Sequence, residues 1–377
     1  MSVHSMRAEK VIESSNRQSV SIFSQPKARE MIRVGIAGIG FMGWMHWLAY
    51  QRTPGVQIVA ICSRDPVKRS GDWTSIKGNF GPVGTHVDLT GVTAFESLDA
   101  MLAADEVDCV DVCLPPDQHV AAATAAAMAG KHVFCEKPLA LNVDDCKAIL
   151  EACRANQVQL LVGHVLPFFP EYKWAREQID SGQYGRLLGG QFKRVISNPD
   201  WLPDFFNPNK VGGPLIDLHV HDAHLIRVLF GMPRRLFCRG RKRGDSVEYA
   251  TTVFEFADPR IVVGSTMGVV HQPGRPFTHG FEIHLEQATI QFEFAGFADH
   301  GETMPVKLID RTGNIIRPHL GDFDPVDSFA AEIGDVVMSI ASGTPSQLLS
   351  GAIACDAIQI CQLQARSCEE NAIVAVT

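Results

Sequence analysis

The feature that most constrains the fold of this chain is a glycine turn near residue 40. The apolar run Ile32 to Ala37 leads into Gly38-Ile39-Gly40-Phe41-Met42-Gly43, and a helix is expected from Trp44 to Tyr50. Gly38 allows a tight turn at positive φ, Gly40 lets the backbone approach a pyrophosphate, and Gly43 lets the helix pack on the strand. The free N–H groups at the helix start, including those of Phe41 and Met42, would face the phosphates. The pattern therefore predicts a dinucleotide site.

The second apolar run bears on which dinucleotide is bound. Val56 to Cys62 is predicted to be a strand, and Ser63-Arg64-Asp65-Pro66 follows it. This fold places its selector for the adenosine ribose about 20 residues after the glycine turn. Ser63 and Arg64 suit a 2′-phosphate, so NADP(H) is expected. Asp65 keeps NAD(H) open, and Arg64 could also be an ordinary solvated charge at a helix start.

Strands and helices alternate after the glycine turn. Further strands are predicted at Val92–Phe95, Val107–Leu114, His132–Cys135 and Val158–Val162, and helices at Ser97–Ala103, Asp117–Ala129 and Val143–Ala155. Such alternation is typical of a parallel sheet with right-handed crossovers. The fold class is therefore α/β, with a doubly wound Rossmann domain over residues 31–155 that binds the dinucleotide.

The pattern changes at Leu187. Strands are predicted at Leu187–Ile196, Tyr249–Phe256, Ile261–Val269, Phe281–Leu285 and Thr289–Phe294, with little helix between them. This favours a large, mostly antiparallel open sheet in a C-terminal α+β domain, residues 156–377. Helices expected at 328–340 and 348–365 would pack back on the domain junction. The polar residues 1–30 are expected to form a tail or an arm onto a neighbouring subunit.

Composition limits the classes of partner. The length of 377 residues suggests two domains, and the formal net charge of −8 comes without a basic run, so nucleic acid is not expected as a partner. No segment reaches the roughly 18 apolar residues of a membrane span, and no signal peptide is recognisable. Ten cysteines include no C-x-x-C pair, which favours buried thiols in a reducing cytoplasm. A small-molecule partner is expected.

A second motif follows the predicted strand His132 to Cys135. Glu136-Lys137-Pro138 comes directly after it. A lysine at the carboxyl end of a parallel strand lies at the crevice where ligands bind. Its ammonium group can hold a substrate hydroxyl or stabilise an oxyanion, which makes Lys137 a candidate catalytic residue. The alternative is a surface lysine beside a proline.

A third motif lies in the second half of the chain. Gly212-Gly213-Pro214 precedes Asp217, His219, His221 and His224. Asp217 and His221 are four residues apart, so they would share one face of a helix. Removing a hydride from a secondary alcohol requires a base for the hydroxyl proton, and histidine titrates closest to neutral pH. A core histidine is the alternative. The spacing of Asp217, His221 and His224 could also build a metal site, but no outside ligand is suggested and no metal is expected.

Together the three motifs resemble the Gfo/Idh/MocA family of glucose-fructose oxidoreductases and inositol dehydrogenases, from residue 31 to about 370. The resemblance implies that Lys137 is the catalytic lysine and that Glu136 contacts the cofactor side. It implies a general base or acid role for His221, with Asp217 binding substrate and orienting His221. It also implies a metal-free enzyme that forms a homodimer or homotetramer through the outer face of the large sheet.

Other residues are expected at the edges of this site. The family pattern has a histidine near the nicotinamide at the position of His119. Leu114-Pro115-Pro116 stands where the family often carries Thr-Pro-Asn, so Leu114 and Pro115 would contact the cofactor without side-chain hydrogen bonds. His164 could face substrate or be structural. His219 is expected to line the substrate pocket or to pack, and His46 to cap or pack the first helix.

The expected function is an NAD(P)-dependent dehydrogenase or reductase that acts on CH–OH groups of a sugar, inositol or related polyol. One alternative keeps the cofactor tightly bound and recycles it in lyase, epimerase or glycosidase chemistry. A second alternative is a non-catalytic NADP-binding sensor of the same fold. The presence of Lys137, Asp217 and His221 together argues against a sensor, which needs none of them.

Overall fold

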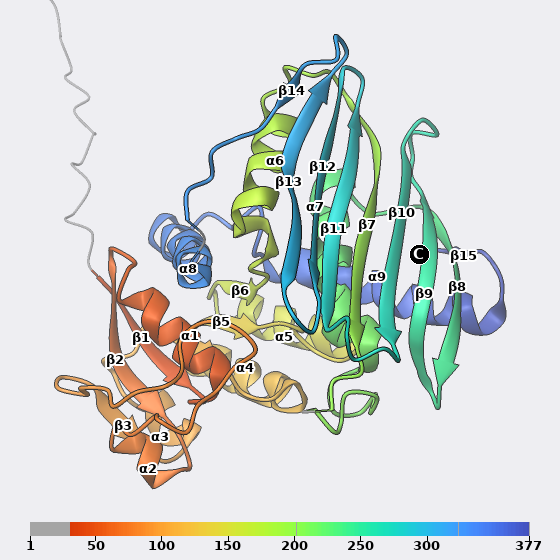
Figure 1. Ribbon diagram of the computed structural model, residues 1–377. Coiled ribbons are helices and arrows are strands. Elements are labelled where there is room, and N and C mark those ends of the chain that lie inside the picture. The colour runs from red at the N-terminus through yellow and green to blue at the C-terminus, as the bar shows by residue number, and fades with distance from the viewer. Residues whose placement is uncertain (1–30, 201, 323, 377) are drawn as a thin grey trace, which may run out of the picture. The chain divides into compact units, whose positions relative to one another are not determined.

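The computed structural model describes residues 31–200, 202–322 and 324–376. The predicted N-terminal tail, residues 1–30, lies outside them. The described chain contains two β-sheets, one parallel and one mostly antiparallel (Figure 1). No described helix is long and apolar enough to cross a membrane.

The parallel sheet has the strand order β3-β2-β1-β4-β5-β6. Its strands are β1 (Ile32–Ala37), β2 (Val56–Cys62), β3 (Thr93–Phe95), β4 (Cys109–Val112), β5 (His132–Glu136) and β6 (Leu160–Gly163). Every neighbouring pair runs parallel. This is the order of the doubly wound Rossmann fold, so that prediction is confirmed. The order reverses between β1 and β4, where this fold binds its ligands.

Helices connect these strands. They are α1 (Phe41–Tyr50), α2 (Pro66–Arg69), α3 (Leu98–Leu102), α4 (His119–Met128) and α5 (Val143–Ala155). In α4 the alanine run provides a close-packing face, because Ala122, Ala123, Ala126 and Ala127 are all buried. Residues 71–92 form an irregular excursion in which Trp73 is fully buried against the rings of Trp44 and Trp47.

The second sheet has nine strands in the order β14-β13-β12-β11-β7-β10-β9-β8-β15. They are β7 (Leu187–Ser197), β8 (Arg235–Arg243), β9 (Ser246–Glu255), β10 (Val262–Val270), β11 (Phe277–Leu285), β12 (Ala288–Gly296), β13 (Gly301–Asp310), β14 (Ile315–Ile316) and β15 (Val374–Ala375). Only β7 and β10 pair in parallel. The predicted antiparallel sheet is confirmed.

One face of this sheet is covered by helices. They are α6 (Pro170–Asp180), α7 (Val220–Phe230) and α9 (Gly351–Glu370), which lie behind the strands in Figure 1. In β9 the buried Phe254 alternates with the exposed Val253, as expected for a sheet with one covered face. The remaining helix, α8 (Pro325–Ser342), packs on α1, where Arg52 pairs with Asp324 at 2.6 Å.

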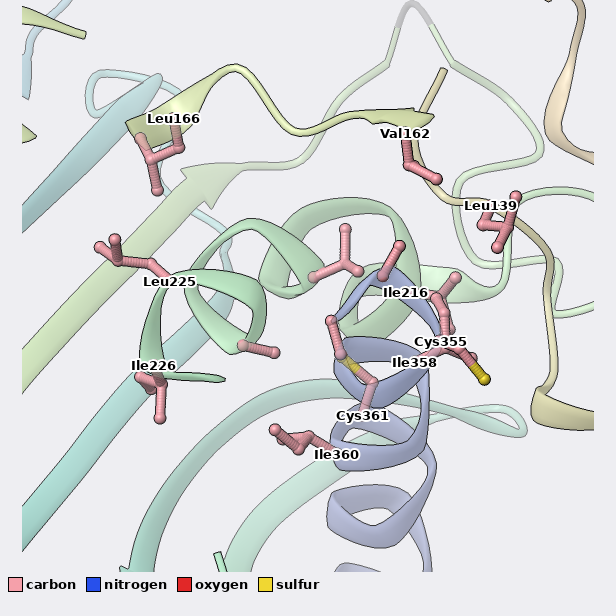
Figure 2. Close-up of a cluster of buried hydrophobic side chains, with 14 of the residues drawn as sticks. Leu139, Val162, Leu166, Ile216, Leu225, Ile226, Cys355, Ile358, Ile360 and Cys361 are labelled. Carbon is pink, nitrogen blue, oxygen red and sulfur yellow. The ribbon is translucent and has the colours of Figure 1, made fainter. Parts of the chain in front are cut away.

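A continuous hydrophobic core connects the two sheets. Figure 2 shows Ile358 and Cys361 of α9 near side chains of α7 and of the segments that carry Leu139 and Val162. Val162 belongs to β6, and Leu139 follows β5. This packing holds the carboxyl ends of β5 and β6 against the segment that precedes α7.

Candidate active site

The glycine turn has the geometry of an anion site. Gly38 has φ of +102°, and a Cβ on Gly43 would lie 2.2 Å from the Gly38 carbonyl oxygen. A Cβ on Gly40 would meet no atom within 4 Å. Helix α1 begins at Phe41 with neither a side-chain cap nor an acidic residue in its first turn. Its first N–H groups are therefore free to bind phosphate oxygens in the space beside Gly40.

The other residues that are predicted to bind the cofactor near the turn offer it mainly backbone groups and apolar surface. The Phe41 ring packs edge-on against Phe80 at 5.0 Å, so only its backbone is directed to the turn. Met42 is half-buried and packs on the core. Leu114 lies against the turn, with its Cδ2 3.1 Å from the position of a Cβ on Gly38, and Pro115 is exposed.

The end of β2 gathers positive charge. The exposed Arg64 has no ion pair or hydrogen bond from its guanidinium within the described ranges. The carboxylate of Asp65 accepts the Val67 N–H at 2.9 Å and so caps α2. Lys68 was not predicted: its Nζ donates to the Ile39 carbonyl at 2.7 Å, which puts the ammonium group beside the glycine turn.

Lys137 extends from the carboxyl end of β5 to the segment before α7. Its Nζ donates to the Asp217 carbonyl at 2.8 Å and to the Asp217 carboxylate at 3.2 Å. Both side chains are partly exposed, at 20% and 24%. The sequence prediction that these two residues belong to one site is therefore consistent with the geometry, although 80 positions separate them.

Three histidines lie next to this pair. His164 is 1% exposed, its ring stacks on His224 at 3.9 Å, and it stands perpendicular to His221 at 6.5 Å. Burial, followed by the charge of Lys137, holds the pKa of His221 well below its usual value. Burial likewise lowers the pKa of His164, and it lowers the pKa of His224 to about 4. His221 is therefore neutral at pH 7 and able to accept a proton.

His164 has unused hydrogen-bonding capacity. Both of its ring nitrogens are buried without a hydrogen-bond partner in the described chain. By contrast, Nε2 of His224 donates to the Leu348 carbonyl at 2.7 Å. Buried polar atoms are normally paired, so an imidazole with two free nitrogens beside Lys137 favours the prediction that His164 faces a polar ligand.

The interpretation of Asp217 as the residue that orients His221 needs correction. Residues Leu215–His219 form a π-helical turn rather than an α-helical one. In a π-turn, hydrogen bonds join residues five apart, so side chains four apart no longer align. Asp217 therefore pairs with Lys137, and no hydrogen bond joins it to His221 in the described chain.

Of the two alternatives expected for His219, the structure agrees with packing rather than with lining the substrate pocket. Its side chain is fully buried, and its Nε2 accepts a hydrogen bond from Nε2 of Gln364 on α9 at 3.0 Å. Gln364 also donates to Thr252 in the sheet. The π-turn directs His219 into the core, and burial there lowers its pKa to about 4.

His119 is also placed differently from its predicted contact with the cofactor. It is fully buried, and its two ring nitrogens face the carbonyl oxygens of Pro138 at 2.7 Å and Leu114 at 2.8 Å. No ring nitrogen remains for a cofactor. Instead, His119 ties the loop after β4 to the loop that carries Lys137.

Comparison with known proteins shows the family of this chain. Residues 32–164 match a family model described as "Oxidoreductase family, NAD-binding Rossmann fold", and residues 172–291 match the C-terminal domain model of the same family. The chain belongs to the Gfo/Idh/MocA oxidoreductase family. The predicted resemblance and the prediction of an NAD(P)-dependent oxidoreductase are confirmed.

Individual relatives of this Gfo/Idh/MocA protein differ in name. The chain is 24% identical to inositol 2-dehydrogenase of Rhizobium meliloti, over 83% of this chain and 89% of the relative. It is 41% identical to 2,7-anhydro-N-acetylneuraminate hydratase of Escherichia coli, but over only 36% of this chain and 37% of the relative. A solved levoglucosan dehydrogenase in complex with NADH and levoglucosan has the same fold, with TM-score 0.73, 22% identity, and coverage of 92% of this chain and 99% of that one.

The family's nicotinamide dinucleotide fits the residues present. The open space beside Gly40 and the uncapped start of α1 suit a pyrophosphate, and Glu136 ends β5, two strands along the sheet from β1. Both Glu136 oxygens are already bound: Oε1 lies 3.0 Å from Nε2 of His46, and Oε2 accepts the Lys137 N–H at 3.0 Å.

Sequence reasoning missed the residues beneath Glu136. His46 does not simply cap or pack α1, because its Nδ1 lies 2.8 Å from Oδ2 of Asp111, in the middle of β4. A carboxylate within the apolar run Cys109–Val112 was the available signal, since a buried charge needs a partner. In the described chain, one ligand atom from each of His46, Asp111 and Cys113 lies close enough to the other two for the three to share a metal ion.

Proposed function

We propose that this chain is a dehydrogenase that passes a hydride between a nicotinamide cofactor and the hydroxyl-bearing carbon of an uncharged sugar, inositol or related polyol. One observation carries the proposal: the Lys137 ammonium, held by Asp217, lies beside the neutral His221 and the unpartnered His164 at the carboxyl end of β5. Ligands of this fold bind at that edge.

The side chains divide the proton chemistry between them. His221, neutral because its pKa is lowered, accepts the hydroxyl proton as the alcohol is oxidised. The Lys137 ammonium stabilises the developing alkoxide, and His164 offers a hydrogen bond to a neighbouring hydroxyl. The bound nicotinamide supplies the hydride acceptor. Asp217 holds Lys137 in position through the ion pair at 3.2 Å.

The charges around the site favour an uncharged substrate. Lys137 pairs with Asp217, the buried Arg194 pairs with Asp222 at 2.7 Å, and Lys210 pairs with Asp117 at 2.7 Å. A phosphate or carboxylate substrate would need a cation that is not already neutralised. The names of two relatives, inositol 2-dehydrogenase and levoglucosan dehydrogenase, point to the same class of substrate.

We further propose a preference for NADP(H) over NAD(H). The free Arg64 guanidinium and the Lys68 ammonium lie at the end of β2, and Asp65 is occupied as a helix cap. A 2′-phosphate would gain charge-assisted hydrogen bonds there, whereas one oxygen of the Asp65 carboxylate is already used to cap α2.

The family resemblance also supports a homodimer or homotetramer that assembles through the uncovered face of the nine-stranded sheet. Phe237, Val253 and Val262 are exposed apolar side chains on this sheet. A cytoplasmic location is proposed because all ten cysteines are unpaired and nine of them are buried.

Turnover measured with a panel of neutral substrates tests the function. The full chain is assayed with inositol, levoglucosan and glucose, with both cofactors, by absorbance of the reduced nicotinamide. We expect Lys137→Met and His221→Asn each to lower kcat/KM by at least about a hundredfold, because each removes a group that acts in the transition state. Arg154→Ala, on the exposed surface of α5, serves as the control. Unchanged turnover in both site variants would refute the assignment.

The hydratase relative motivates a second readout in the same assay. If substrate is consumed without net reduction of added cofactor, and the products are redox-neutral, the cofactor is recycled within the site. That result would replace the dehydrogenase proposal with lyase-type chemistry by the same residues.

A further inference from the structure

His46 lies at the centre of a buried chain of charged groups beneath the site. Its Nδ1 is 2.8 Å from Oδ2 of Asp111 on β4, and its Nε2 is 3.0 Å from Oε1 of Glu136 at the end of β5. The imidazole and Asp111 are fully buried, and the Glu136 side chain is 7% exposed. The ring also stacks on Phe134 at 5.2 Å, so its orientation is fixed.

The two contacts bear on the protonation state of the His46 ring. A neutral imidazole carries one N–H, so one of its nitrogens would point a lone pair at a carboxylate oxygen. With both nitrogens protonated, each donates to one carboxylate. Burial on its own lowers the pKa of His46, but the neighbouring Asp111 carboxylate raises it, and the pKa lies well above its usual value.

The other groups that face His46 do not supply a competing charge. Burial, and then the nearby Glu136, raises the pKa of Glu332 on α8 well above its usual value, which favours the protonated carboxyl group. Burial raises the pKa of the Tyr50 hydroxyl, and burial raises the pKa of the Cys113 thiol, so both are neutral. Among these groups, His46 is the one whose side chain can carry a positive charge.

Fold stability alone does not account for such a group. A buried ion pair contributes little net stability, because desolvation offsets the attraction, and well-packed apolar residues often serve as well. Here the ion pair fixes a specific atom. Glu136 uses its other oxygen, Oε2, to accept the Lys137 N–H at 3.0 Å, so the carboxylate is held at both ends.

We propose that His46 is a positioning residue: as an imidazolium between Asp111 and Glu136, it fixes the Glu136 carboxylate and, through it, the backbone from which Lys137 extends. The step from Glu136 to catalysis rests on the proposed function, because it takes Lys137 as catalytic. The charge state and position of His46 do not depend on that function.

Nitrogen NMR of the full chain labelled with ¹⁵N-histidine tests the charge state directly. His46→Gln identifies the signal, and for the wild type at pH 8 we expect a proton on both ring nitrogens of His46. A wild-type signal with one unprotonated nitrogen would overturn the proposal. So would a stoichiometric metal ion in the wild type that is lost in His46→Gln, since a metal on Nδ1 would displace that proton. If the variant does not fold, the resonance that keeps both protons at pH 8 in the wild type still decides the question.

A double-mutant cycle tests the link to Lys137. We expect His46→Gln to lower kcat by about tenfold to a hundredfold, the cost of a displacement near 1 Å, with less change in the KM for the polyol. In a Glu136→Gln background the same substitution should change kcat by less than about threefold, because His46 acts through that carboxylate. An equal loss in both backgrounds would overturn the proposal.

Two controls separate the possible failures. His132→Gln changes a histidine at the opposite end of β5, where the ring accepts the Gln159 N–H, and kcat is expected to stay unchanged. If Lys137→Met retained turnover, the proposed function would fail whatever the NMR result. Suppose that Lys137→Met were inactive and that His46→Gln lowered kcat equally in the wild-type and Glu136→Gln backgrounds. Then only the positioning role of His46 would fail.

Discussion

Lys137 is the residue on which the chemistry of this site depends at the scale of single side chains. Its ammonium group meets Asp217 across 80 positions of sequence, and its backbone N–H binds the Glu136 carboxylate. Burial, and then the charge of this lysine, lowers the pKa of His221 and keeps the candidate base neutral. Lys137 therefore contributes both to the position of Asp217 and to the lowered pKa of His221.

Arg64 gives the prediction that belongs to this scale. Arg64→Ala should weaken NADPH binding by about tenfold to a hundredfold, since a hydrogen bond between charged groups contributes about 1.5–3 kcal/mol. NADH binding should change by less than about threefold, because NADH lacks the 2′-phosphate. Fluorescence titration of both reduced cofactors measures the two affinities, with Arg154→Ala as a matched surface control. Equal losses for the two cofactors would contradict a phosphate-binding role.

Which site residues could be predicted from sequence depended on whether their signal was local. Lys137 and His221 were recognisable because each lies in a short motif. The pairing of Lys137 with Asp217 was not, because it depends on a π-turn that the spacing does not reveal. His46 and Asp111 are 65 positions apart, and only the fold brings their side chains together.

At the scale of elements, the strand, turn and helix around Gly40 form the most sharply defined unit. The two other glycines of the motif are enclosed, since a Cβ on Gly38 or Gly43 would lie within 2.6 Å of a backbone oxygen. Gly40 borders open space. Gly38 and Gly43 are therefore constrained by packing within the fold, whereas Gly40 is constrained by the space that the ligand needs.

Gly40→Ala should separate binding from folding. We expect its free energy of unfolding without cofactor to stay within about 0.5 kcal/mol of the wild type, while cofactor affinity falls at least about tenfold. Gly43→Ala should lose both stability and cofactor affinity, because its Cβ would meet the Gly38 carbonyl oxygen. Gly334→Ala in α8 also meets no atom within 4 Å and should leave affinity unchanged. Wild-type affinity in Gly40→Ala would exclude pyrophosphate binding at this turn.

The predicted strands that agree with the structure are either continuous apolar runs, as in β4 and β6, or alternating patterns, as in β9. Strands β8 and β13 were missed because their outer halves are exposed on both faces and carry charged residues, so the alternation of buried and exposed positions is lost. The strand β9 between β8 and β10 keeps that alternation and was found. A period-2 pattern arises where one face of a strand is buried and the other is exposed. Strand segments that are exposed on both faces therefore lack it.

At the scale of the whole molecule, buried neutral histidines link stability to pH. The pKa values of seven histidines are lowered, chiefly by burial: His119, His132, His164, His219, His221, His224 and His279. An unfolded chain binds protons on these groups near pH 6.5, and the folded chain does not. Three carboxyl groups with raised pKa values, Glu171, Glu332 and Asp335, act in the opposite sense.

The free energy of unfolding should therefore fall as the pH drops from 6.5 to about 4.5. The stabilisation is fully present above the ordinary histidine pKa, and the loss should exceed about 1.4 kcal/mol per pH unit, the slope of one net proton. Urea unfolding at several pH values measures it. His279→Gln, which keeps an acceptor for the Tyr172 hydroxyl, should reduce the slope. Constant or rising stability over this range would contradict the account.

Hydride transfer between substrate and nicotinamide can be followed with a single labelled hydrogen atom. A neutral polyol from the panel, deuterated at the carbon that is oxidised, is incubated with the full chain and oxidised cofactor, and the reduced cofactor is analysed by mass spectrometry. Direct hydride transfer from the polyol gives one deuterium per reduced nicotinamide with wild-type protein, and Lys137→Met should lose this transfer. Product formation without net cofactor reduction, or reduced cofactor that carries no deuterium, would contradict it.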